Sequence, residues 1–298
     1  MKKSIISLSG LLFIFLNLSG CTTLPVQNGN DTLSKRIPRD TGETTKGAGV
    51  DQANRFTSVP VNSLKELPAK HSNRVALVIG NGDYKSKALS NPIYDAQDMS
   101  NTLNKLGFSV TQVLNADQAT MNKAIQKFGR ELHDDRVGLW YYSGHGVQYE
   151  GKNYMIPIWA MLAIDKPSEL STDAVSVNGV LSMMEQAKNR LNIVFLDACR
   201  NNPFEGFTKG KKDGLAPVGS AEGMLIAYAT SPNKVALIGK GRNSPYTKYL
   251  LHYMEQDLPI ELMLKQVRVA VKNETNGEQT PWFAASFGGD FTFAIPQH

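Results

Sequence analysis

The chain has 298 residues, of which 41% are hydrophobic and 20% charged; the length allows one large domain or two small ones, and the composition excludes wholesale disorder. Its 32 lysines and arginines exceed its 27 aspartates and glutamates by five, too small and scattered an excess to indicate nucleic acid as the main partner. Two cysteines, Cys21 and Cys199, exclude a disulfide scaffold and a cysteine-rich zinc site. These exclusions favour a soluble globular enzyme.

The N-terminus carries the pattern of a targeting segment. Lys2 and Lys3 precede an apolar run over residues 5–16, which has signal-peptide length and is too short to span a membrane. The sequence Leu18-Ser19-Gly20-Cys21 resembles the lipobox of bacterial lipoproteins, in which the bond before the cysteine is cut and the new N-terminal thiol is lipidated. The resemblance implies a signal peptide over 1–20 and a lipid on Cys21. The alternative is an ordinary secretory signal with a cysteine nearby.

A lipid on Cys21 would place the protein outside the cytoplasm, anchored to the periplasmic face of a bacterial membrane. Because Thr22 rather than an aspartate follows the cysteine, the pattern resembles lipoproteins sent to the outer membrane in cells that have one. Cys199 would then be the lone thiol of an exported protein. An unpaired thiol is a liability in an oxidising compartment, which favours a functional role for Cys199.

The composition changes near residue 73. Residues 21–72 are rich in Thr, Asn, Gly, Lys and Asp without a sustained apolar period, which predicts a flexible polar tether. From Arg74 onward, short apolar runs typical of strands buried on both faces alternate with helical periodicities. The predicted strands are 75–79, 108–114, 137–142, 193–196 and 224–228, and the predicted helices are 96–106, 121–132, 180–187, 246–254 and 260–271. The alternation predicts an α/β fold with helices on both faces of the sheet, whose chemistry gathers at the carboxyl ends of the strands.

Two of these strands end in residues suited to catalysis. One runs into Ser143-Gly144-His145-Gly146, and the other into Asp197-Ala198-Cys199. A cysteine peptidase needs a thiol that becomes a thiolate, a base that takes its proton and later protonates the leaving amine, and amide donors for the oxyanion. Taken singly, His145 is equally explained as a core or turn histidine and Cys199 as a small buried hydrophobe. Their joint placement at strand ends favours catalysis.

The two strand ends resemble the active-site blocks of the caspase-like cysteine peptidases, most closely those of the bacterial metacaspase-like (orthocaspase) branch. The resemblance runs from about residue 74 to 293. Further matching blocks are Val78-Ile79-Gly80-Asn81, Asn91-Pro92-Ile93-Tyr94-Asp95-Ala96, Gly223-Met224-Leu225-Ile226-Ala227-Tyr228-Ala229-Thr230, Gly241-Arg242-Asn243-Ser244-Pro245-Tyr246 and Gln279-Thr280-Pro281-Trp282. It implies a three-layer αβα caspase-like fold around a mostly parallel central sheet. It also implies Cys199 as nucleophile, His145 as general base and acid, and the backbone amides of Gly146 and Cys199 as the oxyanion hole.

The same resemblance bears on specificity. In the metacaspase branch the pocket for the residue before the scissile bond resembles one lined by acids and a serine, positions occupied here by Asp95, Ser143 and Asp197. Carboxylates facing one pocket favour a Lys or Arg side chain and repel an acidic one. The alternative for Asp95 is an acid that complements the N-terminal dipole of a helix. That alternative is weaker for Asp197, because an acid that ends an apolar strand needs a partner.

The resemblance divides the folded part of the chain. A large-subunit-like part over 73–204 and a small-subunit-like part over 222–298 belong to one domain, joined by a polar loop over 205–221. That loop resembles the joint at which caspase-like enzymes cut themselves, and Lys211 and Lys212 are the candidate self-cleavage residues. A solvated loop that is never cut is an equal alternative.

Two segments depart from the family pattern. After Pro157, where relatives usually carry an aspartate two residues on, the chain continues Ile158-Trp159-Ala160, and Phe283-Ala284-Ala285 replaces a commonly more polar run. Both are expected near the substrate cleft, where they would affect rate, specificity or activation. Some metacaspases require calcium, but the sequence contains no EF-hand-type loop, and we expect neither a metal nor a cofactor.

Three functions are compatible with these residues. The first is a membrane-tethered cysteine endopeptidase that cuts protein or peptide substrates after Lys or Arg through a Cys199–His145 dyad. The second is a weakly active or inactive caspase-fold lipoprotein that binds peptides or acts as a scaffold. The third is a hydrolase of non-peptide esters or amides that uses the same two residues. The intact Cys199 and His145 favour the first.

Overall fold

The computed structural model describes residues 59–69, 73–133, 135–199, 204, 215, 222–231, 234 and 236–294, with Cys199 described by its backbone alone. The predicted signal segment, the lipidation residue Cys21 and the candidate self-cleavage residues Lys211 and Lys212 lie outside these ranges. Within the described ranges, no helix is both long enough and apolar enough to cross a lipid bilayer.

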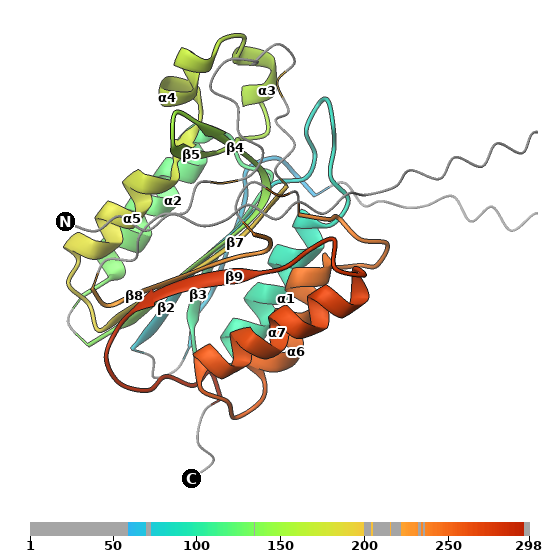
Figure 1. Cartoon of the computed structure of the whole chain (residues 1–298). Coiled ribbons are helices and arrows are strands. Elements are labelled where there is room, and N and C mark those ends of the chain that lie inside the picture. Colours follow the sequence, from blue (N-terminus) through green and yellow to red (C-terminus); the bar gives the residue numbers. More distant parts are fainter. Residues whose placement is uncertain are drawn as a thin grey trace, which may run out of the picture. The chain divides into compact units, whose positions relative to one another are not determined.

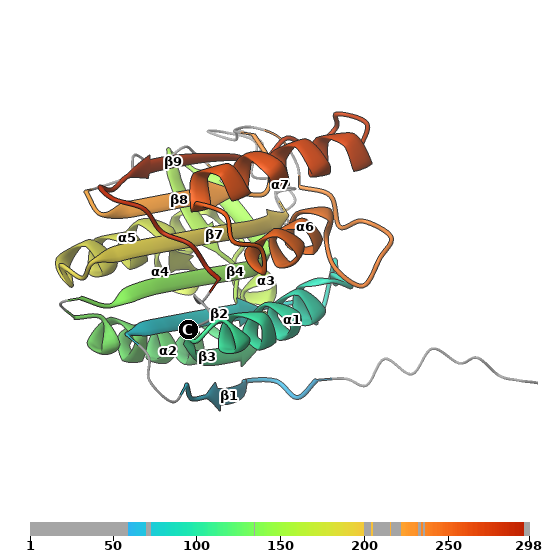
Figure 2. The same cartoon turned by 90° about the horizontal axis from the view of Figure 1, so that it is seen from below.

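A mixed sheet runs through the described part of the chain (Figure 2). Its parallel core consists of β3 (Ser109–Leu114), β2 (Arg74–Gly80), β4 (Val137–Tyr149), β7 (Leu191–Cys199) and β8 (Met224–Tyr228), in that spatial order. The antiparallel strands β1 (Ser63–Leu67) and β9 (Trp282–Ser286) flank this core on the β3 and β8 sides. The short strands β5 (Lys152–Met155) and β6 (Val175–Ser176) extend the end of β4 in antiparallel pairing.

Helices cover both faces of this sheet, as Figures 1 and 2 show. The helices α1 (Pro92–Lys105), α6 (Pro245–Met254) and α7 (Ile260–Glu274) lie on one face, and α2 (Gln118–Glu131) and α5 (Val177–Gln186) lie on the other. Three short elements, α3 (Ala160–Ala163), the 3-10 turn η1 (Pro167–Glu169) and α4 (Leu170–Asp173), follow β5. The predicted three-layer α/β architecture is confirmed.

Two apolar cores, one on each face, follow from strand alternation. In β4, Leu139 and Tyr141 pack into the core beneath α1, α6 and α7, whereas Trp140 and Tyr142 pack into the core beneath α2 and α5. Successive side chains of a strand point to opposite faces, so a strand covered on both sides must be apolar throughout. The uninterrupted apolar runs of the sequence therefore correspond to the central strands.

The ordered fold begins before residue 73, within the segment that the composition predicted to be a tether. Ser63–Leu67 forms β1, and its backbone pairs with β3 from Ser63 opposite Leu114 to Leu67 opposite Val110. Its side chains are mostly exposed, except for Ser63 and Leu67, which are half-buried. An edge strand can be held largely by backbone hydrogen bonds, so a polar sequence such as Ser-Leu-Lys-Glu-Leu carries little apolar signal.

Candidate active site

The two predicted catalytic segments lie side by side at the carboxyl edge of the sheet. β4 and β7 pair in parallel, with Ser143 opposite Asp197 and, two positions on, His145 opposite Cys199. Little space separates the strands at this point: a Cβ added to Gly146 would lie only 3.0 Å from the Cβ of Ala198. Strand pairing thus places the histidine and cysteine backbones next to each other, as the sequence predicted.

His145 is held as a neutral base. Its side chain is buried, and its Nε2 lies 2.7 Å from the carbonyl oxygen of Lys87. A carbonyl only accepts hydrogen bonds, so Nε2 carries the proton and Nδ1 carries the lone pair. Nδ1 is buried and has no hydrogen-bond partner among the described residues. Burial lowers the pKa of His145. The hydrogen bond to the Lys87 carbonyl opposes this lowering, and the Lys87 charge adds to it. The net lowering keeps the imidazole neutral and able to accept a proton.

Tyr84 holds the same histidine from a second side. Its ring centroid lies 4.5 Å from that of the imidazole, and its hydroxyl accepts a 3.0 Å hydrogen bond from the His145 amide and donates at 2.9 Å to the Ile156 carbonyl. The Tyr142 hydroxyl donates at 2.7 Å to the His145 carbonyl. A Cβ added to Gly144 would lie 2.7 Å from the Tyr142 hydroxyl and 2.9 Å from the Tyr84 hydroxyl. The glycine before His145 is therefore required by the two tyrosines that fix the histidine backbone.

Tyr84 and Lys87 belong to one loop, which follows β2 and is anchored by Asn115. The Asn115 side-chain oxygen accepts 3.1 Å hydrogen bonds from the amides of Gly82 and Asp83, and its Nδ2 donates at 2.6 Å to the Asp83 carboxylate. Asn115 is itself fully buried. The loop is thus fixed at its start by the end of β3 and contacts the imidazole further along.

The three residues predicted to set specificity also come together, next to the histidine. Asp95 lies in the first turn of α1, and Ser143 and Asp197 face it from β4 and β7; all three are buried. The Ser143 hydroxyl donates at 3.3 Å to Asp95 Oδ2. Asp95 therefore occupies the helix-dipole position of the alternative interpretation and also belongs to a cluster with Ser143 and Asp197.

Two residues at the start of α6 complete this acid cluster, which we define as Asp95, Ser143, Asp197, Ser244 and Thr247. The Ser244 amide donates at 3.0 Å to Asp95 Oδ1, and the Ser244 hydroxyl donates to Asp197 Oδ2. The Thr247 hydroxyl donates to the same Asp197 Oδ2 at 2.7 Å. Asp95 of α1 and Asp197 of β7 are thus both tied to the first turn of α6.

Burial governs the charge of the cluster. It raises the pKa of Asp197 to about 6, against opposing hydrogen bonds from Ser244 and Thr247. Burial, and then the charge of Asp197, raise the pKa of Asp95 well above its ordinary value, again against hydrogen bonds that favour the carboxylate. Two neighbouring buried acids whose pKa values are both raised form a site that gains from a cation placed between them.

Sequence reasoning missed four residues of this site. Ser244 carried an available signal, because a serine before a proline and a helical period is a helix N-cap pattern, whereas nothing marked Thr247 beyond its place in the same first turn. Lys87 contributes a backbone carbonyl, for which no side-chain pattern exists. Tyr84 lies in a short polar segment after β2 and had no periodicity to mark it.

Other predicted site features stay predictions. The side chain of Cys199 lies outside the described residues, and so do Lys211 and Lys212. Gly146 is placed in β4 opposite Met155 of β5, next to the catalytic pair, but the oxyanion-hole role of its amide is untested. Among the described residues, no group of three or more His, Cys, Asp or Glu side chains is placed to hold a metal ion.

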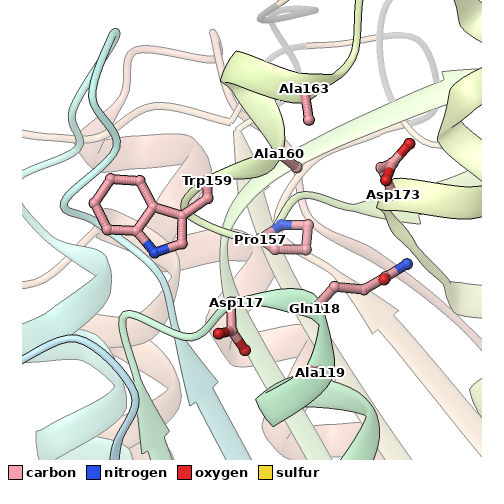
Figure 3. Close-up of a pocket in the computed structure, with 8 residues that line it drawn as sticks. All are labelled: Asp117, Gln118, Ala119, Pro157, Trp159, Ala160, Ala163 and Asp173. Carbon is pink, nitrogen blue, oxygen red and sulfur yellow. The ribbon is translucent and has the colours of Figure 1, made fainter.

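The apolar Trp159 segment forms a hollow of its own. Trp159 is 38% exposed and Leu162 is 63% exposed, and the ammonium of Lys85 lies 5.3 Å from the indole centroid. A cavity of about 280 Å³ opens beside this segment (Figure 3). It is lined by Asp117, Gln118, Ala119, Pro157, Trp159, Ala160, Ala163 and Asp173. The lining includes neither His145 nor a member of the acid cluster, so this departure from the family pattern shapes a neighbouring surface.

The second departure has a structural explanation away from the acid cluster. Phe283, Ala284 and Ala285 lie in β9 and pair with Ala227, Ile226 and Leu225 of β8. Trp282 at the start of β9 stacks on Tyr228, with ring centroids 4.8 Å apart and planes within 1°. The apolar side chains of this run therefore belong to the edge strand that pairs with β8.

Comparison with known proteins assigns the family. The sequence model of the peptidase C14 caspase domain matches residues 73–292. The chain belongs to the caspase-domain family. The match covers the sheet core, His145, the Cys199 position and the acid cluster, and it supports a cysteine peptidase in general.

Relatives of this caspase-domain protein include the human mucosa-associated lymphoid tissue lymphoma translocation protein 1, 26% identical over 86% of this chain and 31% of that protein. Its mouse homologue is 28% identical over 73% of this chain and 26% of that protein. A probable protease from a Desulfuromonadales bacterium is 29% identical over 42% of this chain and 16% of that protein. The alignments thus span less than a third of the length of each relative.

The fold agrees with a solved caspase. The crystal structure of caspase-1 from Spodoptera frugiperda superimposes with a TM-score of 0.55 and 19% sequence identity, covering 77% of this chain and 94% of that one. At this identity the likeness establishes the fold alone. The orthocaspase branch and the lipoprotein signal are not addressed by any of these comparisons.

Proposed function

We propose that this caspase-domain protein is a cysteine endopeptidase that hydrolyses peptide bonds after Arg or Lys through His145 and Cys199. The observation that carries the proposal is the β4–β7 register, which sets His145 opposite Cys199 while the Lys87 carbonyl keeps the imidazole proton on Nε2. The free lone pair of Nδ1 is the atom that such a reaction needs.

The reaction follows from these positions. Nδ1 of His145 takes the thiol proton of Cys199, and the thiolate sulfur attacks the carbonyl carbon of the substrate. The carbon–nitrogen bond then breaks, and the imidazolium returns the proton to the leaving amine, which leaves a thioester on Cys199. Water then attacks the thioester carbon and gives a proton to His145, the carbon–sulfur bond breaks to release the carboxylic acid product, and the imidazolium returns its proton to the Cys199 sulfur. The amides of Gly146 and Cys199 are the proposed donors to the oxyanion.

The acid cluster supports the choice of substrate. Ser143 and Asp197 lie two residue pairs before His145 and Cys199 in the strand register, and Asp95 of α1 contacts Ser143, an arrangement that suits the side chain that precedes the scissile bond. A charged hydrogen bond is worth about 1.5–3 kcal/mol, and tenfold in rate corresponds to about 1.4 kcal/mol. A basic residue should therefore be preferred over a neutral one by at least about tenfold in kcat/KM. Arg should exceed Lys if its planar fork reaches both carboxylates.

Matched fluorogenic peptides that differ only before the cleaved bond test the proposal. We expect cleavage after Arg and Lys, at least about tenfold weaker cleavage after Gln, and none after Asp, with the Cys199→Ala protein as the blank. Parallel assays with and without added calcium determine whether a cation is needed. Equal cleavage after Arg and Asp would overturn the acidic specificity site. Absence of turnover with retained peptide binding would favour the scaffold alternative.

The membrane tether is a separate proposal, supported by the lipobox-like sequence that ends at Cys21. We propose that the mature chain begins at a lipidated Cys21 and reaches the folded domain through the polar segment that follows. In a bacterial host, the Cys21→Ser protein should leave the membrane fraction and lose the mass of the diacylglycerol group. An unchanged membrane fraction and an unchanged mass would refute lipidation without bearing on the catalytic proposal.

Self-cleavage of the joint is proposed at Lys211 or Lys212, because both are basic residues that the acid cluster would accept. Incubated wild-type protein should separate into two fragments whose masses place the cut after one of these lysines. The Cys199→Ala protein should stay intact. Fragments that also form in the Cys199→Ala protein would show that another protease makes the cut.

A further inference from the structure

We infer that Ser244 and Thr247 are positioning residues that orient the two acids toward a basic substrate side chain, so that the first turn of α6 helps to set specificity. This inference rests on the proposed Arg/Lys specificity and names residues that the family resemblance did not assign. It is carried by hydrogen bonds that join residues far apart in the sequence, Ser244 lying 149 positions after Asp95 and 47 after Asp197.

Ser244 makes a separate contact with each acid. Its amide donates to Asp95 Oδ1 at 3.0 Å, and its hydroxyl donates to Asp197 Oδ2. The same hydroxyl oxygen accepts a 3.0 Å hydrogen bond from the Thr247 amide, as the N-cap of α6. Because the hydroxyl has a single proton, accepting from Thr247 leaves that proton for Asp197. The Ser244 hydroxyl therefore both caps α6 and orients the Asp197 carboxylate.

Thr247 adds a second donor whose direction is also fixed. Its hydroxyl donates at 2.7 Å to Asp197 Oδ2, so the 2.6 Å contact with the Tyr141 hydroxyl must be one that Thr247 accepts. The chain therefore runs from Tyr141 through Thr247 to Asp197, and all three residues are buried. Consecutive hydrogen bonds in a buried chain strengthen one another.

The consequence is a carboxylate with two different oxygens. Oδ2 of Asp197 receives both hydroxyls, whereas Oδ1 receives neither of them. Two donors on one oxygen fix the plane of the carboxylate and leave the second oxygen to a guanidinium or ammonium group. Asp95 is held through both oxygens instead, with the Ser244 amide on Oδ1 and the Ser143 hydroxyl on Oδ2.

The surroundings of Asp197 predict how the variants should titrate. Asp95 faces it from α1, Tyr141 lies on the adjoining strand β4, and Tyr246 lies on α6. Burial raises the pKa of all three, and the charge of Asp197 adds to each rise. The hydrogen bonds from Ser244 and Thr247 oppose the rise in the pKa of Asp197 that burial causes. Removal of either hydroxyl should therefore raise that pKa further and move the acidic limb of the Arg-to-Gln preference, which reports Asp197, to higher pH.

The test compares Ser244→Ala and Thr247→Val with Ser176→Ala, each assayed with matched Arg and Gln peptides across pH. Ser176 is the N-cap of α5 on the opposite face of the sheet and accepts from the Gly179 amide at 3.2 Å, so its loss costs a helix cap without touching the acids. We expect the Arg-to-Gln ratio of kcat/KM to fall about tenfold in Ser244→Ala, chiefly through KM for the Arg peptide, and by a smaller factor in Thr247→Val. Ser244→Thr, which keeps a hydroxyl and a cap, should restore the ratio.

The outcomes separate the inference from the function on which it rests. If the wild-type protein prefers Arg and both variants keep that preference within about twofold with an unshifted acidic limb, Ser244 and Thr247 have only a structural role and the inference is wrong. If the wild-type protein shows no preference for Arg, the proposed specificity itself fails. A Ser244→Ala protein that does not fold leaves Thr247→Val, which retains the cap, to decide the question. Ser176→Ala should retain both the ratio and the limb.

Discussion

The Nε2 nitrogen of His145 lies 2.7 Å from the carbonyl oxygen of Lys87, a residue 58 positions earlier in the chain. The group that orients the proposed base is thus a peptide carbonyl on the loop after β2. Lys87 has a positive φ of 55°, which turns its backbone in a way that most residues adopt rarely. The function of this position lies in its backbone conformation, and its side chain contributes mainly charge.

Replacing Lys87 with Gln should therefore retain most activity. The carbonyl remains in place, and kcat should stay within a few-fold of the wild-type value. Because the Lys87 charge lowers the pKa of His145, its removal should raise that pKa toward the ordinary value, and the acidic limb that reports His145 should move to slightly higher pH. A pH profile of kcat/KM for a single Arg peptide measures both effects. Loss of activity in Lys87→Gln would mean that the ammonium group itself takes part in the reaction.

His145→Ala and Cys199→Ala should each abolish peptide hydrolysis while the protein stays folded. The two residues act on the same proton, so the double variant should be little worse than either single one. Circular dichroism and thermal unfolding would confirm the fold, and prolonged hydrolysis assays with one Arg peptide would measure the residual turnover. Near-normal turnover in either variant would assign the chemistry to other residues.

Tyr84→Phe should impair catalysis through the position of His145. The change removes the acceptor of the buried His145 amide and the donor to the Ile156 carbonyl, at a cost of about 1–3 kcal/mol in the free energy of unfolding. We expect kcat to fall by about tenfold or more with little change in KM, because small displacements of a base are costly.

Tyr246→Phe is the matched control for Tyr84→Phe. The Tyr246 hydroxyl is buried and has no hydrogen-bond partner among the described residues. Its removal should leave kcat unchanged and leave the protein as stable as before, or more so. If the two variants lose kcat equally, the effect of Tyr84→Phe would not arise from contact with His145.

The sequence predicted the central architecture because buried strands appear as uninterrupted apolar runs and amphipathic helices as strong apolar periods. The five predicted strands correspond to β2, β3, β4, β7 and β8, and the five predicted helices correspond to α1, α2, α5, α6 and α7. The peripheral strands β1, β5, β6 and β9 were missed. They are short, and β1 and β9 pair with one neighbour each and have partly exposed side chains, which weakens any periodic signal.

The site was predictable where chemistry belongs to side chains at strand ends. His145, Asp95, Ser143 and Asp197 converge as the resemblance implied, because parallel strands deliver their carboxyl ends to one edge. The residues that position them were not predictable in the same way. The Lys87 contribution is a carbonyl, and the role of Ser244 depends on how α6 docks against Asp95 and Asp197. Such contacts are properties of tertiary packing.

The buried acids should make stability depend on pH. The pKa of Asp197 rises from 3.8 to about 6 in the folded protein, so its contribution to stability is fully present below pH 3.8 and is lost as the pH rises through 6. The loss amounts to at most about 3 kcal/mol, since one pKa unit is worth about 1.4 kcal/mol. Asp197→Asn should therefore flatten this part of the profile and gain relative to the wild-type protein between pH 5 and 7.5, while Arg preference declines.

Urea unfolding at pH 5 and pH 7.5 measures this effect. The control is Asp98→Asn, which removes an acid of α1 whose pKa is lowered by hydrogen bonds from Arg242 and Asn243. Because that pKa lies below 3.8, the stabilisation from Asp98 is complete above this value and is lost only at lower pH, so Asp98→Asn should change the free energy of unfolding equally at pH 5 and pH 7.5. Identical pH profiles of the free energy of unfolding for wild-type and Asp197→Asn proteins would show that folding does not raise the pKa of Asp197.

Gly144→Ala should damage both the fold and the site. The new Cβ would lie 2.7 Å and 2.9 Å from the hydroxyls of Tyr142 and Tyr84, closer than carbon and oxygen atoms pack. One of the hydroxyls must then move, and each of them holds a backbone group of His145. We expect a loss of about 1–3 kcal/mol in the free energy of unfolding and a fall in kcat larger than that of Tyr84→Phe.

Gly179→Ala is the internal comparison for this last prediction. Gly179 lies in α5, and a Cβ there would meet nothing closer than 3.7 Å. An alanine in that helix should raise stability by up to about 1 kcal/mol without changing kcat, because glycine is the weaker helix former. Thermal unfolding and kcat/KM for one Arg peptide, measured on both variants, separate a steric effect at the histidine from a general effect of adding a methyl group. A Gly144→Ala protein with normal kcat would show that the tyrosine hydroxyls can move without displacing His145, and the proposed role of Tyr84 would fail with it.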